Sequence, residues 1–267
     1  MFDRHSAAAI RFNTVQYRLR AKSQALLMRL EGNLRRIMTF WFVMALAGCA
    51  VRIGISPIHH APDLSTFLPY VLVIGGPLVS MGLALMWFEG GEKLPQPTTR
   101  LALVGRWRNV GLTEAQRHPL YGSSGIMVSL LVGMLLNVPV RALEYLAAIP
   151  ALSGTVPAWL STLHLMMTLD VVLLTSLYTI AFVAALRRVP LFPRLLVAIW
   201  AIDIAMQLGI AGVVTGTQGL PGPVADALHT LLDGNVKKVL ISVSLWLPYL
   251  LLSKRVNVTF RHRVEAA

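Results

Sequence analysis

The sequence predicts an all-α polytopic membrane protein with six transmembrane helices. Apolar residues make up 55% of the 267 residues and charged residues only 13%, whereas a soluble domain carries about 25% charged residues. Six apolar segments approach or exceed the ~20 residues that a membrane-spanning helix needs. Basic residues gather in the connections on one side of these segments, which is the positive-inside pattern. This pattern predicts that the N-terminus and the C-terminus are both cytoplasmic.

The basic residues lie in four hydrophilic stretches. Twenty of the 24 Lys and Arg residues fall within residues 4–36, 93–117, 187–194 and 254–263. A net charge of +12 could indicate a nucleic-acid partner, but the charge is spread beside apolar spans and not over one polar domain. Attraction to anionic headgroups accounts for it better, at roughly 1 kcal/mol per basic residue. We therefore expect the lipid bilayer with anionic headgroups as a partner, and no nucleic acid.

The six spans follow from length and apolar content. Pro190 and Pro193 stand at the entrance of the fifth span, where proline is tolerated in the first helical turn. Pro77 and Pro248 lie inside the second and sixth spans and predict kinks. The expected spans are 37–55, 66–88, 121–140, 161–186, 191–215 and 231–253.

The spans divide the chain into five regions. Residues 1–36 form a basic, amphipathic cytoplasmic tail, read as a helix lying on the inner leaflet, with a partly disordered basic tail as the alternative. Residues 37–88 form an N-terminal helix pair, and residues 89–118 a Gly- and Pro-containing cytoplasmic linker. Residues 119–260 form a four-helix transmembrane unit, and residues 261–267 a C-terminal tail.

A C-terminal pattern resembles a known family. The chain has Trp-Leu-Pro-Tyr at 246–249, Ser-Lys-Arg-Val at 253–256 and Thr-Phe at 259–260. This resembles the end of a bacterial inner-membrane domain of unknown function, family 2569, and the resemblance covers about 119–260. At the entrance of the first helix, the family's Gly-Gly-Trp is replaced by Ser-Gly-Ile at 124–126. The resemblance implies four spans and a bacterial inner (cytoplasmic) membrane location, and it brings no activity.

A second, local resemblance concerns Arg117-His118-Pro119-Leu120-Tyr121. It is similar to the Arg-His-Pro-x-Tyr signature of isoprenylcysteine and phospholipid methyltransferases, which precedes a membrane helix and helps to bind S-adenosylmethionine. The resemblance implies Arg117, His118 and Tyr121 as an alternative cofactor-binding set. The family's paired downstream glutamates are missing, because the chain has no adjacent Glu pair. The alternative interpretation is a basic, proline-marked helix entrance, so we expect no catalytic residue, cofactor or metal.

Polar side chains inside the spans are the best candidates for a site, because each charge costs about 2.5–3.5 kcal/mol near the membrane centre. At 1.5 Å per residue, Asp170 and Lys238 both lie roughly 24 Å above the inner boundary, and Arg52 roughly 22 Å. We expect Asp170 to contact Lys237 or Lys238, with Arg141 or Arg52 nearby. The expected intramembrane polar cluster is Asp170, Asp203, Gln207, Lys237, Lys238, Arg52 and Arg141.

This cluster has two interpretations. It is a set of buried ion pairs that fix helix register, or a polar pocket, open to the outer side, that binds an anionic head group or conducts a proton through Asp170 and Asp203. The sequence favours a non-enzymatic accessory, binding or transport-related protein, as a subunit of a larger membrane complex or a homo-oligomer. The alternative is an S-adenosylmethionine-dependent membrane methyltransferase.

Overall fold

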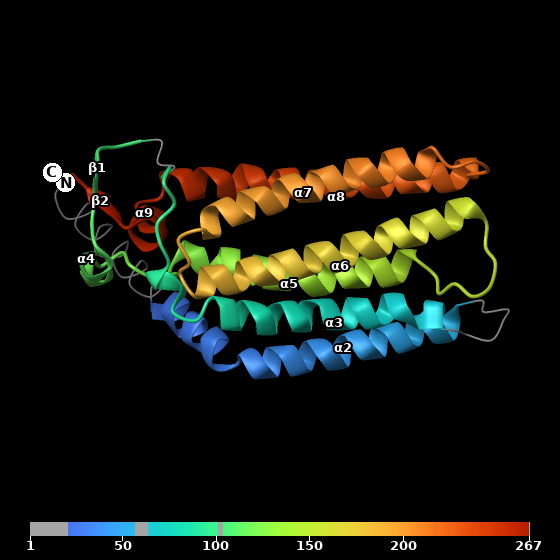
Figure 1. Cartoon of the computed structure of the whole chain (residues 1–267), viewed down its shortest axis with the longest axis horizontal. Coiled ribbons are helices and arrows are strands. Elements are labelled where there is room, and N and C mark those ends of the chain that lie inside the picture. The colour runs from blue at the N-terminus through green and yellow to red at the C-terminus, as the bar shows by residue number, and fades with distance from the viewer. Residues whose placement is uncertain (1–20, 57–63, 101–103, 267) are drawn as a thin grey trace, which may run out of the picture.

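The computed structural model describes residues 21–56, 64–100 and 104–266. Within them, six helices are long and apolar enough to cross a membrane, which confirms the predicted fold class (Figure 1). They are α2 (Leu34–Ile55), α3 (Leu64–Trp87), α5 (Ile126–Ala148), α6 (Ala158–Leu186), α7 (Phe192–Thr215) and α8 (Gly222–Leu252).

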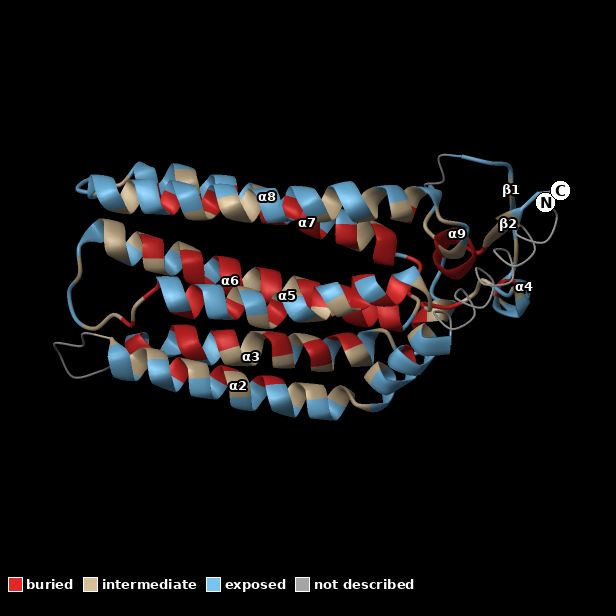
Figure 2. Cartoon of the chain, turned by 180° about the vertical axis from the view of Figure 1, so that it is seen from behind, coloured by how far each residue is buried: buried red, intermediate tan, exposed pale blue. Residues whose placement is uncertain are grey.

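Helix α6 lies at the centre of the bundle. Helices α3, α5 and α7 all pack along it, α2 packs on α3 and α5, and α8 packs on α7. Figure 2 shows buried residues concentrated on α6 and its neighbours, and α8 mostly exposed. Leu174 and Phe182 of α6 are both fully buried, as expected for a helix against which three others pack. The remaining helices turn one face to α6 or its neighbours and the other outward.

Two observed helices extend well beyond the predicted spans at one end. The third was expected to end at residue 140, but α5 continues to Ala148, which places Arg141 inside the helix. The sixth was expected from residue 231, but α8 begins at Gly222, directly after Pro221. In both cases the charged residues that lower the local hydropathy do not end the helix. These are Arg141 and Glu144 in α5 and Asp226 in the first turns of α8.

One end of the bundle, which we call the basic end, holds the short elements. These are η1 (Gly91–Lys93), β1 (Trp107–Asn109), α4 (Leu112–Arg117), α9 (Lys254–Arg261) and β2 (Arg263–Glu265) (Figure 1). Strand β1 pairs antiparallel with β2, with Trp107 opposite Glu265 and Asn109 opposite Arg263. The sequence did not predict this sheet, which joins the segment after α3 to the end of the chain.

Helix α9 is buried at the basic end. The ring of Phe260 lies 5.1 Å from that of Phe192, centroid to centroid. Arg261 is 5% exposed and donates to the Leu250 carbonyl oxygen at 2.9 Å and to Asn257 Oδ1 at 2.8 Å. It therefore satisfies a carbonyl left open at the C-terminus of α8. Burial, with the nearby Arg263 and Arg194, lowers the pKa of Arg261 to about 10.

A further helical segment precedes α2. Residues 21–32 are helical and a turn at Asn33 separates them from α2. Asn33 Nδ2 donates to the Arg29 carbonyl oxygen at 2.7 Å. The predicted amphipathic tail covers residues 1–36, of which only residues 21–36 lie in the described part of the chain. These residues are largely helical, as expected.

Candidate functional site

The centre of the candidate site is Arg141, which joins three helices. From α5, its Nη1 donates to Asp170 Oδ2 of α6 at 2.9 Å. Its Nη2 donates to both oxygens of Asp203 of α7, at 2.9 and 2.7 Å. The side chains of Arg141, Asp170 and Asp203 are 12%, 6% and 0% exposed. Two carboxylates and one guanidinium are thus buried together in the bundle.

Two neutral side chains complete the hydrogen bonds of the carboxylates. Tyr178 Oη donates to Asp203 Oδ2 at 3.0 Å, and Gln207 Nε2 donates to Asp170 Oδ1 at 2.9 Å. Each of the four carboxylate oxygens therefore accepts at least one hydrogen bond, as buried charges require. We call these five residues the Arg141 network.

The helical repeat explains how the network is assembled. Tyr178 lies two turns after Asp170 on α6, and Gln207 one turn after Asp203 on α7, so each pair shares a helix face. Helices α5 and α7 both pack on α6, which brings the two faces to Arg141. The side-chain oxygen Oε1 of Gln207 accepts in turn from Asn235 Nδ2 of α8 at 3.1 Å, so four helices contribute.

The network borders a cavity of about 470 Å³ between α5, α6 and α8, which we call the polar cavity after the charged side chains in its lining. Arg141 and Asp170 line it from the buried side, and Glu144, Asn235 and Lys238 line it further out. Lys238 Nζ forms an ion pair with Glu144 and lies 3.4 Å from Asn235 Oδ1. Arg141 stands seven residues, or roughly 10 Å, before the end of α5. The cavity therefore lies in the half of the bundle away from the basic end.

The structure brings five of the seven predicted cluster residues to one place: Asp170, Asp203, Gln207, Arg141 and Lys238. Arg52 is elsewhere and donates through Nε to the Ile149 carbonyl oxygen at 2.8 Å. Lys237 is exposed on α8 and does not line the cavity. Both therefore drop out of the candidate site.

The predicted pairing of Asp170 with Lys237 or Lys238 was wrong. Asp170 pairs with Arg141, and Lys238 pairs with Glu144. The cause is the true length of α5, since Arg141 was expected at the end of a helix and lies within one. Only the expectation that Arg141 would be near Asp170 is confirmed.

Sequence reasoning missed Tyr178, Asn235 and Glu144. Tyr178 had a signal, because it shares the face of Asp170. Glu144 had one too, because it lies one turn after Arg141 and has Lys238 at a similar predicted depth. Asn235 had only its position three residues before Lys238. Neutral polar residues and tyrosine attract little notice in a hydropathy profile, although they supply half of the hydrogen bonds here.

The Arg117-His118-Pro119 motif lies at the basic end, where α4 ends at Arg117. His118 Nδ1 accepts from the Leu120 backbone N–H at 3.1 Å. Tyr121 Oη donates to Glu92 Oε2 at 2.8 Å, and Arg188 Nη1 donates to the same oxygen at 3.3 Å. Burial and the Glu92 carboxylate raise the pKa of Tyr121 to about 12. The motif thus connects η1, α4 and the turn between α6 and α7.

In the described part of the chain, no group of three or more His, Cys, Asp or Glu residues is arranged to hold a metal ion. The fold and the Arg141 network define a multi-pass integral membrane protein with a charged, hydrogen-bonded centre. No family model, curated protein or solved structure matches the chain. The two family resemblances seen in the sequence therefore stay predictions.

Proposed function

We propose that this chain is a non-enzymatic integral membrane protein of binding or transport-related type, with the Arg141 network and its cavity as the working site. The observation that carries this proposal is a buried group of one guanidinium and two carboxylates beside a polar cavity. Ionisable residues at membrane depth are expensive and commonly mark ion or substrate pathways. A purely structural pair would need neither a second carboxylate nor an adjoining cavity.

The charge balance favours a proton or a cationic group over an anion. Arg141 supplies one positive charge against the two carboxylates of Asp170 and Asp203. The other charged pair at the cavity, Lys238 with Glu144, is balanced. With both aspartates ionised, the site holds one excess negative charge, which is costly in a low-dielectric region. Taking up a proton removes that excess, so we favour proton uptake over the binding of an anionic head group.

The direction of uptake follows from the basic residues. Most of the Lys and Arg residues in the described part of the chain lie at the basic end. We therefore assign this end to the cytoplasmic side of a bacterial inner membrane. The polar cavity then faces the outer side. A proton entering there reaches Asp170 first, because this residue lines the cavity, and then Asp203, which is fully buried.

Proton flux into liposomes tests this function. We expect a membrane potential to acidify the interior of proteoliposomes that contain the wild type, as reported by an enclosed pH dye. The rate of acidification should exceed that of empty liposomes. Asp203→Asn should abolish the difference. Asp226→Asn, which changes an exposed acid of α8 outside the network, should retain it. Wild-type flux equal to that of empty liposomes would refute proton transport through the network.

A further inference from the structure

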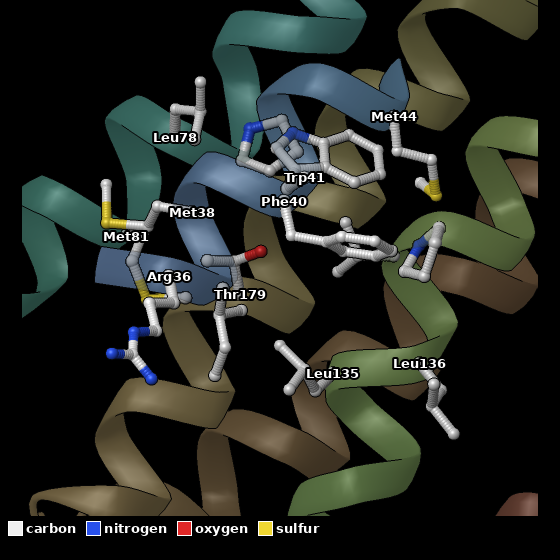
Figure 3. A pocket seen from close by; sticks show the side chains of 14 residues that line it. Arg36, Met38, Phe40, Trp41, Met44, Leu78, Met81, Leu135, Leu136 and Thr179 are labelled. Carbon is white, nitrogen blue, oxygen red and sulfur yellow. The ribbon is translucent and has the colours of Figure 1, made fainter. Parts of the chain in front are cut away.

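A second concave surface lies on the other side of the bundle. It is an apolar groove of about 320 Å³ between α2, α3 and α5, with Thr179 of α6 also in its lining (Figure 3). Phe40 and Trp41 line it from α2, Met81 from α3 and Leu136 from α5. It shares no residue with the polar cavity. The inference drawn from this groove therefore does not rest on the function proposed above.

The surface of the groove is mainly apolar, and its neutral polar side chains, those of Trp41 and Thr179, are hydrogen-bonded within the protein. Trp41 Nε1 donates to the Ile74 carbonyl oxygen at 3.1 Å, and Thr179 Oγ1 to the Thr175 carbonyl oxygen at 2.7 Å. Pro77 and Pro139, which lack a backbone N–H, lie in its lining. The bound part of a ligand must therefore be apolar, because it finds no free donor among these groups.

The dimensions fit one leaflet of a bilayer. Along α2 the groove runs from Arg36 to Met44, which is eight residues or roughly 12 Å. The hydrocarbon core of a bilayer is about 30 Å thick, so one leaflet contributes about 15 Å. The groove thus begins at the basic end of α2 and stops near the middle of the membrane. An acyl chain of a lipid in this leaflet spans the same depth of the membrane.

The open end of the groove is positively charged. Arg36 lines it there and is exposed (Figure 3). The first turn of α2 holds no acidic residue, and within the described residues Arg36 forms no ion pair. A guanidinium is well suited to bind phosphate oxygens. The charge at this end complements an anionic headgroup.

We propose that this groove binds one acyl chain of an anionic phospholipid from the leaflet at the basic end, with the lipid phosphate at Arg36. The apolar lining, the one-leaflet length and the single cation at the mouth all match this ligand. Phe40, which is 70% exposed, lies at the edge of the groove, where it would pack against the acyl chain. The lipid fills the space that α2 and α5 leave between them.

Trp41 makes the site measurable, because it lies in the lining. The test uses the full chain in nanodiscs, with the other five tryptophans changed to phenylalanine. Phosphatidylglycerol or phosphatidylcholine with brominated acyl chains is added at equal low mole fraction. We expect the brominated phosphatidylglycerol to quench Trp41 several-fold more than the phosphatidylcholine. Equal quenching by both lipids, or no quenching by either, would overturn the proposal.

A matched pair of variants assigns the headgroup contact. Arg36→Gln should abolish the preference for phosphatidylglycerol. Arg35→Gln removes the same charge one residue away, outside the groove, and should retain it. Equal losses in both variants would reduce the effect to general attraction and refute the site. If the variant with five tryptophans changed to phenylalanine does not fold, native mass spectrometry of Arg36→Gln and Arg35→Gln in the wild-type background tests the headgroup contact. One retained anionic lipid should then be lost in Arg36→Gln only.

Discussion

At the scale of single residues, substitution of Arg141 should destabilise the network more than substitution of either aspartate. It is the only cation bonded to Asp170 and Asp203 in the described structure, so removing it leaves two buried carboxylates without compensation. Removing one carboxylate leaves a balanced pair of Arg141 with the other. The two kinds of substitution therefore differ in cost, because only the loss of Arg141 leaves a buried charge without a partner.

Arg141→Met should cost about 3–5 kcal/mol of unfolding free energy, the usual cost of stranding a buried charge. Asp170→Asn should cost only about 1–2 kcal/mol, since it removes one hydrogen bond but leaves Arg141 balanced by Asp203. Denaturant unfolding in detergent micelles, followed by circular dichroism, measures both. Lys238→Met is the control, because its pair with Glu144 is exposed and worth about 1 kcal/mol or less. A larger loss for Asp170→Asn than for Arg141→Met would contradict this charge balance.

The contacts of His118 lead to a prediction about the methyltransferase alternative. Its Nδ1 atom is used by the Leu120 backbone N–H, which is the role of a residue at a helix entrance. We expect isothermal titration calorimetry to detect no S-adenosylmethionine binding to the wild type, and His118→Ala to fold normally. A binding heat in the wild type that disappears in His118→Ala would support the methyltransferase instead.

At the scale of elements, the sequence located all six spans but misplaced the ends that matter most. Hydropathy identifies the apolar middle of a helix, and it fails where a buried charge is paired in three dimensions. The 37–55 and 191–215 spans agree with α2 and α7 to within three residues. The third span was ended at residue 140 because Arg141 appeared to belong to an interface. Its partners on α6 and α7 could not be read from one segment alone.

The sheet of β1 and β2 was beyond prediction for a different reason. Three-residue strands carry too little pattern, and their pairing joins residues more than 150 positions apart. The partners of Arg261 were hidden as well, because a C-terminal basic cluster is usually a solvated tail. Here α9 is buried against α7 and α8.

The junction of α9 and β2 should weaken in acid. His262 is 6% exposed, and burial lowers its pKa below 6.5, with Arg100 adding to the effect and Glu92 opposing it. The folded form thus favours neutral histidine. The stabilisation that neutral His262 gives to the folded protein is fully present above the unfolded pKa of about 6.5. It is lost as the pH falls from there through the lower pKa of the folded state. After correction for the intrinsic exchange rate, which itself falls with pH, the protection of the amides of residues 254–266 against hydrogen exchange should decrease between pH 7 and 5.5.

The control for this junction is His262→Asn. Position 262 has φ 46°, in the left-handed region that asparagine tolerates better than most residues. This variant should lose the excess pH dependence while β1 and β2 still pair. If its exchange rates change with pH as the wild type's do, another group is responsible.

At the scale of the whole molecule, the two candidate sites lie on different sides of the central helix and in different halves of the bundle. The polar cavity involves α5, α6 and α8 away from the basic end, and the apolar groove involves α2, α3 and α5 toward it. Helix α5 takes part in both, with Pro139 in the groove and Arg141 in the network only two residues later. Lipid in the groove would therefore hold α2 against the helix that carries Arg141.

The orientation of this arrangement decides which side supplies the cavity. Reporter fusions after Lys93 and after Arg188, both at the basic end, should give a cytoplasmic signal. Fusions at residues 60 and 222 should give an outer signal. The physical reason is the asymmetry of Lys and Arg between the two sides, which biases insertion. An alkaline phosphatase and green fluorescent protein pair measures both states, since each is active on one side only. Reversed signals at both pairs would turn the cavity toward the cytoplasm, and the proposed proton entry from the outer side would be refuted.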